Sequence, residues 1–267
     1  MPVFTADTDI ELNYRVEGAG PRLVNISGSA GDLRAPSLIR DELERFFTVL
    51  SWDQRGLGQS SKPDRRFTMA DYADDTVALM HHIGWDTAHV LGVSFGGMVA
   101  QELAVTRPDL VESLVLMCTS TGGAGGSSYP LHELPDLPPD DLLVFRMEIV
   151  DSRRDAAWRD ANPEKLAKLI AATKAARVGE DEPDREAGIA RQLEARAEHD
   201  AWDRLPSLNA PTFILGGKFD NQAPPTNQLA LVSQIRGSRL QMYEGGHLCA
   251  VQDKQAIPDI IDFLQGC

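Results

Sequence analysis

Short apolar runs alternate with amphipathic segments along most of the chain, and no other feature limits the possible folds as strongly. Residues 88–93 are rich in valine and leucine, which favours a buried strand, and residues 95–106 directly after them place apolar side chains at helical spacing. The same pair of patterns recurs before and after this segment. Strands that alternate with helices are typical of parallel sheets, because parallel neighbours need a crossover connection. The sequence therefore predicts an α/β fold with a mostly parallel central sheet flanked by helices.

The individual elements follow from periodicity and from residues that start or stop helices. Thr68 is a typical helix N-cap, and Pro108 is a typical helix stop. The expected strands are residues 3–6, 11–18, 22–27, 46–53, 88–93, 111–119, 210–217 and 238–246. The expected helices that flank the sheet are residues 34–45, 68–83, 95–106, 224–235 and 249–264.

The alternation stops after residue 119, where the sequence reads TSTGGAGGSSYP. Glycine and serine favour a flexible crossing at this point. The charged segment that follows, up to Pro206, has helical periodicity at residues 140–150, 162–178 and 184–199 and no strand pattern. We therefore expect residues 1–120 and 207–267 to form one α/β core, and residues 121–206 to form an inserted helical cap.

Composition excludes several classes of function. The chain has 267 residues, 42% of them hydrophobic, and a formal net charge of −14. This charge opposes binding to nucleic acids and to anionic membranes. The sequence shows neither a secretory signal nor an apolar run of about 18 residues that could span a bilayer. The three cysteines are too few and too far apart for a disulfide framework or a zinc site, so we expect a cytoplasmic enzyme without metal or cofactor.

The sequence GVSFG at residues 92–96 joins a predicted strand to a predicted helix through one serine. A sharp turn here crowds Ser94 against its second neighbours, and glycine at both of those positions relieves the crowding. The turn would leave the Phe95 amide N–H at the helix start, where it can face developing negative charge. We interpret Ser94 as a catalytic nucleophile. The alternative is a tight glycine turn that carries an incidental serine.

A serine nucleophile needs a histidine base and an acid that orients the histidine. Asp220 follows the predicted strand at 210–217, and His247 follows the last predicted strand, so the chain has the order serine, acid, histidine. Asp53 is the alternative acid, although its place in a DQRG loop favours a structural role. The histidines that do not follow a strand in this way are expected to be surface or core residues: His89, His132 and His199.

Four stretches of the sequence match motifs of one superfamily. They read GVSFGG, GGKFDNQAPP, YEGGHLCAVQD and, at residues 53–63, DQRGLGQSSKP. With these motifs the chain resembles the α/β-hydrolase superfamily over nearly its whole length, and within it the small-molecule esterases and enol-lactonases. The resemblance implies an α/β-hydrolase fold, the catalytic triad Ser94, Asp220 and His247, and a structural role for Asp53 and Arg55.

The same resemblance places a second oxyanion donor in the loop after the strand at residues 22–27. Many relatives carry His-Gly in this loop, whereas this chain reads Ser27-Gly28-Ser29. By position, the backbone N–H groups of Ser29 and Phe95 are the expected oxyanion hole. We expect Ser27 and Gly28 to contact the substrate. The alternative is that the two serines only tighten a glycine turn.

The predicted cap supplies further candidates for the substrate site. Trp158 either lines the pocket or anchors the cap helices, and Arg146, Arg153 and Arg154 either pair with a substrate carboxylate or are solvated. The residues together predict a hydrolase of a small carboxylic ester or lactone. Two alternatives remain: a C–C bond hydrolase or a non-hydrolytic cyclase or lyase of secondary metabolism with the same triad, and a ligand receptor that keeps the hydrolase shell. Ser94 excludes haloalkane dehalogenase chemistry, which needs a carboxylate at this turn.

Overall fold

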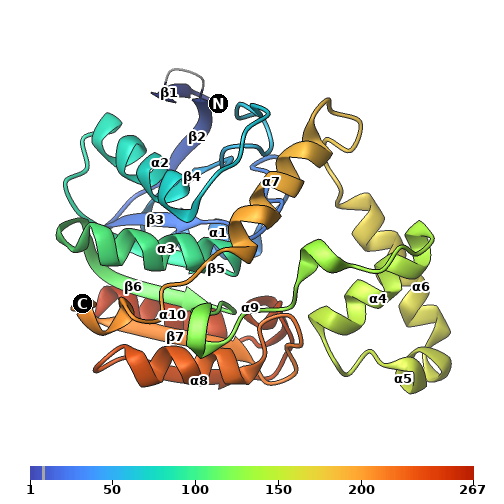
Figure 1. Ribbon diagram of the computed structural model, residues 1–267. Helices are drawn as coiled ribbons and strands as arrows, with labels where there is room; N and C mark the ends of the chain where they lie inside the picture. Colours follow the sequence, from blue (N-terminus) through green and yellow to red (C-terminus); the bar gives the residue numbers. More distant parts are fainter. Residues whose placement is uncertain (8–9) are drawn as a thin grey trace.

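A single mixed sheet forms the centre of the molecule. The computed structural model describes residues 1–7 and 10–267, and among them the sheet has eight strands in the order β1-β2-β4-β3-β5-β6-β7-β8 (Figure 1). The strands are β1 (Val3–Asp7), β2 (Ile10–Gly18), β3 (Arg22–Ile26), β4 (Thr48–Trp52), β5 (Ala88–Val93), β6 (Val111–Met117), β7 (Thr212–Gly217) and β8 (Arg239–Tyr243). Neighbouring strands are parallel from β4 to β8, and β2 is antiparallel to both β1 and β4. The predicted mostly parallel α/β sheet is confirmed.

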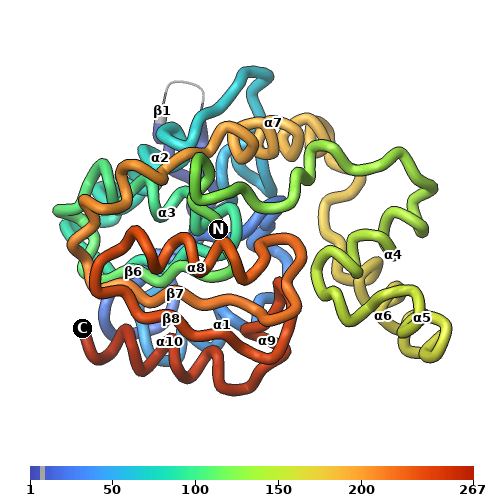
Figure 2. The backbone as a smooth tube through the Cα atoms, turned by 60° about the horizontal axis from the view of Figure 1, so that its bottom comes forward, coloured from blue at the N-terminus to red at the C-terminus, as the bar shows by residue number. Residues whose placement is uncertain are grey.

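Helices cover both faces of this sheet. The helices of one face are α2 (Met69–His82), α3 (Phe95–Thr106) and α8 (Pro225–Gln234), and those of the other are α1 (Leu38–Leu43), α9 (Cys249–Gln252) and α10 (Ala256–Gln265). Leu103 of α3 and Leu231 of α8 belong to one buried cluster, whereas Leu43 of α1 and Ile260 of α10 belong to another. Figure 2 shows α8 and α10 on opposite sides of β7 and β8. The sheet is therefore buried from both sides, which is why its strands read as continuous apolar runs.

Most predicted elements lie within a few residues of their observed bounds. Helix α2 begins after Thr68, whose hydroxyl accepts the Asp71 N–H while the Asp71 carboxylate accepts the Thr68 N–H, so the capping prediction is confirmed. The prediction of one closing helix over 249–264 is wrong, because Asp253 accepts the backbone N–H of Gln255 and Glu244 and separates α9 from α10. Helix α5 (Ala156–Ala161) was not predicted.

The segment between β6 and β7 is helical, and its long helices lie to one side of the sheet and above it (Figure 1). The long helices are α4 (Pro139–Val150), α6 (Pro163–Ala175) and α7 (Arg185–Ala197), and the short helix α5 stands between α4 and α6 in the chain. Gly122 and Asp200 form a β-bridge, and the Ala201 N–H donates to the Thr121 carbonyl, so this segment leaves the core and returns to it at one place. The division into an α/β core and an inserted cap at residues 121–206 stays a prediction.

Helix α7 is held against the core by contacts along its length. Gly188 packs so closely on Gly56 that a Cβ at residue 188 would overlap the Gly56 carbonyl oxygen. The Gln192 side chain accepts the Ala30 N–H at 2.9 Å, and Arg191 pairs with Asp64 at 2.7 Å. The helix is thereby tied to the loops that follow β3 and β4.

Candidate active site

The turn after β5 places Ser94 in a backbone conformation that few residues adopt. Its φ is 54° and its ψ is −114°, and α3 begins directly after it. A Cβ at Gly92 would overlap the Gly96 carbonyl oxygen, and a Cβ at Gly96 would overlap the Ile26 carbonyl oxygen. Glycine at both positions is therefore a steric requirement of the turn. Strain of this kind at a non-glycine residue is typical of functional sites.

The three residues predicted as a triad lie together at the carboxyl edge of the sheet. The Ser94 Oγ is 2.9 Å from Nε2 of His247, and Nδ1 of the same ring is 2.7 Å from Oδ2 of Asp220. Asp220 is 1% exposed and His247 is 8% exposed. A carboxylate only accepts hydrogen bonds, so Nδ1 carries the proton and Nε2 is left to accept from the serine hydroxyl. The geometry is that of an activated nucleophile, its base and the group that orients the base.

Asp220 is fixed from behind by two backbone donors. Its Oδ1 accepts the N–H of Gln222 at 2.8 Å and of Ala223 at 2.9 Å, which leaves Oδ2 for His247. The Gln222 side chain then turns toward the base, and its amide nitrogen lies 2.8 Å from Nε2 of His247. Two donors, Ser94 and Gln222, therefore face one lone pair. The sequence analysis missed this contact, although Gln222 stands only two residues after Asp220.

The loop after β3 packs beside the nucleophile, as expected from its position. A Cβ at Gly28 would lie 3.6 Å from the Ser94 Cβ, and Gly28 and Ser29 both line the cavity above Ser94. Phe95 is the first residue of α3, so its N–H has no acceptor within the helix. The Ser29 hydroxyl is buried and has no hydrogen-bond partner among the described residues. The backbone N–H groups of Ser29 and Phe95, together with the Ser29 hydroxyl, are available to a bound substrate.

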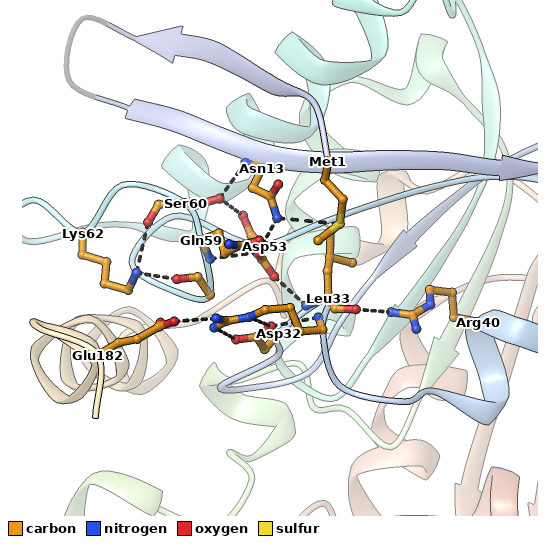
Figure 3. A network of polar contacts seen from close by, with 12 residues as sticks. Met1, Asn13, Asp32, Leu33, Arg40, Asp53, Gln59, Ser60, Lys62 and Glu182 are labelled. Atoms are coloured by element: carbon orange, nitrogen blue, oxygen red, sulfur yellow. Dashed lines mark hydrogen bonds and ion pairs between the residues drawn. The ribbon is translucent and has the colours of Figure 1, made fainter. Parts of the chain in front are cut away.

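Asp53, the alternative acid, is engaged in a separate network (Figure 3). Its carboxylate accepts the Asn13 side-chain amide at 2.7 Å and the backbone N–H of Leu33 and Gln59 at 2.7 and 2.9 Å. Burial raises the pKa of Asp53 despite these bonds. The network joins β2, the loop after β3 and the DQRG loop, and Nδ1 of His247 bonds to Asp220 instead.

Arg55 of the same loop has a buried ion pair with α2. Its guanidinium donates two bonds of 2.7 Å to Asp75 and one of 3.1 Å to Asp71, and it stacks over Phe67 with 5.3 Å between the charge and the ring centroid. Arg55 is 3% exposed and Asp75 is 2% exposed. These contacts accord with the structural role expected from the resemblance.

A cavity of about 370 Å³ opens above Ser94 and His247. Its wall is mostly apolar and includes Met117, Ile149 and Leu193, while Gln222 and Arg146 add polar groups. Burial, and secondarily the neighbouring Arg177, lowers the pKa of Arg146. A cavity of this volume with apolar walls and a few polar groups is typical of a small-molecule site.

Two predicted substrate contacts lie elsewhere in the structure. Ser27 does not line the Ser94 cavity among the described residues, and its hydroxyl accepts the Gln54 side-chain amide at 3.1 Å. Trp158 lies on α5, half-buried, and is likewise not among the residues that line this cavity. Gly28 does line it. Of the three cap arginines, Arg146 reaches the cavity, whereas Arg153 pairs with Asp151 at 2.7 Å.

Two buried cysteines lie behind the triad. The thiols of Cys118 and Cys249 are 3.6 Å apart, and one ligand atom each of Cys118, Asp220 and His247 lie within 4.8 Å of one another. The contact with Cys249, together with burial, raises the pKa of the Cys118 thiol, so that it stays protonated at neutral pH. Asp220 and His247 already bind each other, so Cys118, Asp220 and His247 together form the rear wall of the site. Cys249 itself is fully buried.

Hydrolases are among the known proteins to which this chain is similar. The chain is 27% identical to a mouse (Mus musculus) protein described as serine hydrolase BPHL, over 96% of this chain and 84% of that protein. It is 25% identical to 2-hydroxymuconate semialdehyde hydrolase of Pseudomonas sp. strain CF600, over 96% of this chain and 90% of that protein. The crystal structure of an enol-lactonase from Burkholderia xenovorans LB400 superposes with a TM-score of 0.78 at 24% identity, covering 99% of this chain and 100% of that chain.

No described helix has the length and apolar character needed to cross a membrane.

The chain also matches a protein-family model. The family model for the alpha/beta hydrolase fold matches residues 21–253, which is most of the chain. The chain belongs to the alpha/beta hydrolase fold family.

Proposed function

We propose that this hydrolase cleaves a small carboxylic ester or lactone through an acyl-enzyme on Ser94. The observation that carries the proposal is the continuous hydrogen-bonded series from Ser94 Oγ through His247 to Asp220, at 2.9 and 2.7 Å. Such a series makes an alcohol nucleophilic at neutral pH without a metal or cofactor.

The first half of the reaction forms the acyl-enzyme. Ser94 Oγ attacks the substrate carbonyl carbon while Nε2 of His247 takes the hydroxyl proton, and the Asp220 carboxylate stabilises the resulting imidazolium. The tetrahedral oxyanion accepts hydrogen bonds from the backbone N–H groups of Ser29 and Phe95. His247 then gives its proton to the leaving alkoxide oxygen, and the carbon–oxygen bond breaks.

The second half releases the acid. Water takes the place of the departed alcohol, His247 removes a proton from it, and the hydroxide oxygen attacks the acyl carbonyl. The second tetrahedral intermediate collapses with return of the proton to Ser94. A lactone follows the same course, with the alcohol remaining part of the product.

The cavity favours a substrate that is largely apolar around the scissile bond. Met117, Ile149 and Leu193 line the cavity above Ser94, and the unpartnered Ser29 hydroxyl offers one hydrogen bond. Arg146 at the cap side of the cavity is the group that would pair with a substrate carboxylate, as the sequence analysis left open.

A second candidate, C–C bond hydrolysis, has one specific observation in its favour. The relative from Pseudomonas sp. strain CF600 is described as 2-hydroxymuconate semialdehyde hydrolase and matches 96% of this chain. The same triad would serve that reaction. Product analysis after incubation with a vinylogous diketone and with a panel of esters and lactones separates the two candidates.

The proposal is tested by removing the hydroxyl of Ser94. We expect Ser94→Ala to lower kcat for p-nitrophenyl butyrate by about 10⁴-fold or more. Ser233→Ala is the matched control, because Ser233 is exposed on α8 and its hydroxyl bonds only to the Ala230 carbonyl. A Ser94→Ala protein with the turnover of the control would contradict the proposal.

A further inference from the structure

A second cavity, of about 180 Å³, lies beside the Ser94 cavity and contains none of the triad residues. The short segment after the glycine-rich crossing separates the two: Leu131 lines the Ser94 cavity, whereas Pro130 and His132 line the second one. The far wall of the second cavity is the last turn of α7, with Arg196, and His199 just beyond it. We call it the Arg196 cavity.

Arg196 is a buried cation without a counter-ion among the described residues. It is 5% exposed, and no described carboxylate lies within ion-pair distance of its guanidinium. Its two terminal nitrogens donate to the Tyr129 carbonyl and to the Ser128 hydroxyl, each at 2.7 Å, and its Nε has no acceptor. A buried charge is normally paired, because removing it from water is costly. In a chain with a net charge of −14, the absence of a carboxylate here is unexpected.

The cavity wall holds a second buried polar side chain without a partner among the described residues. His199 is 5% exposed, and neither of its ring nitrogens has a hydrogen-bond partner of normal geometry. Ser120, Ser127 and Ser128 also line this space. The Ser120 hydroxyl accepts the Ser128 N–H at 3.2 Å, and Ser127 is exposed. Burial lowers the pKa of Arg196 to about 10, so its guanidinium is still charged at neutral pH.

These groups share one property: they complement a small anion. A carboxylate or phosphate group offers the acceptor that Nε of Arg196 lacks, and it neutralises the guanidinium. We propose that the Arg196 cavity binds a small oxyanion, a carboxylate or a phosphate group. Glu133 is exposed at the cavity and bonded to His132, so its carboxylate repels an entering anion and weakens binding without filling the site.

The position of the cavity connects it to the catalytic site. Ile189 and Leu193 of α7 line the Ser94 cavity on the same helix that carries Arg196. Helix α7 also contacts the short helix at Leu131–Glu133. A bound anion would join these two elements through Arg196 and the serine hydroxyls, and would therefore reduce their local opening.

The test measures thermal unfolding of the full chain at constant ionic strength, with chloride replaced by inorganic phosphate or by acetate. At an anion concentration ten times Kd we expect Tm to rise by about 3 °C. The arm with the larger rise identifies the preferred oxyanion. Arg196→Gln should lose this response, whereas the control Arg191→Gln, a half-buried position of the same helix paired with Asp64, should keep it. The control also accounts for general salting effects of phosphate.

Two further measurements keep the test decisive if Arg196→Gln does not fold. Glu133→Gln removes the repelling carboxylate and should lower the Kd for the preferred anion severalfold. Hydrogen exchange should slow in residues 128–133 and 190–199 when that anion is added. Equal anion responses in wild type and Arg196→Gln, or an unchanged Kd in Glu133→Gln together with no slowing of exchange in these segments, would overturn the proposal.

Discussion

Replacing Asp220 with asparagine gives the sharpest prediction from the site geometry. Oδ1 of Asp220 accepts two backbone N–H groups, from Gln222 and Ala223, and Oδ2 faces Nδ1 of His247. In Asp220→Asn the amide oxygen must stay toward the two backbone donors, so the amide NH₂ takes the place of Oδ2. An NH₂ group donates, and it therefore forces Nδ1 to accept and moves the ring proton to Nε2. The base then faces Ser94 with a proton instead of a lone pair.

The magnitude follows from the loss of that tautomer. A wrong tautomer costs about 10⁴-fold in kcat in a triad of this kind, which is about 5.5 kcal/mol of transition-state stabilisation. The fold should be retained, because both backbone bonds to residue 220 survive. The assay is p-nitrophenyl butyrate hydrolysis, with urea unfolding as the check on stability.

Asp53→Asn is the matched control for this prediction. Asp53 bonds to Asn13, Leu33 and Gln59 and has no contact with His247, so its replacement should reduce stability while changing kcat by less than about tenfold. If Asp220→Asn retained kcat within tenfold of wild type while Asp53→Asn abolished it, the assignment of the orienting acid would be refuted.

Three other perturbations have defined outcomes. Gly96→Ala should lower the free energy of unfolding in urea by about 3 kcal/mol or more, because the added Cβ overlaps the Ile26 carbonyl oxygen; an unchanged urea midpoint would contradict the turn geometry. Gln222→Leu removes the donor that competes with Ser94 for Nε2 of His247, so the rate of fluorophosphonate labelling should rise about 2- to 10-fold, and a fall would contradict this role. His199 has a pKa of about 4 because it is buried, against 6.5 in the unfolded chain. The unfolded chain thus binds more protons between these values, and stability should fall by up to about 3 kcal/mol as the pH drops from 7 to 4 in buffers free of phosphate and acetate; an equal fall in His199→Gln would contradict it.

The parts of the site that could be predicted are those encoded locally or by chain order. The turn around Ser94 needs glycine at two fixed positions, and the sequence shows both. Asp220 and His247 each follow a strand of a parallel sheet, and the carboxyl ends of such strands meet at one edge. Thr68 and Asp71 cap α2 through contacts only three residues apart, so the start of that helix could also be predicted from the sequence.

The parts that could not be predicted depend on tertiary packing. Trp158 reads as a pocket residue because it is aromatic and in the cap, but where it lies depends on how α5 sits against its neighbours. Arg196 bonds to Ser128 across 68 residues of sequence, and no local pattern indicates that its charge is buried. The contact of Gln222 with His247 depends on a side-chain rotamer. The sequence therefore shows that Gln222 is close to Asp220 but does not show that its side chain points toward His247.

The account depends most on Ser94 being the group that reacts, and covalent labelling tests this directly. After reaction with a fluorophosphonate, we expect the intact protein to gain the mass of one phosphonyl group. Peptide mapping should place that group on Ser94, and Asp220→Asn should be labelled far more slowly. A label on any other residue, or wild-type protein that stays unlabelled while folded, would contradict the central claim.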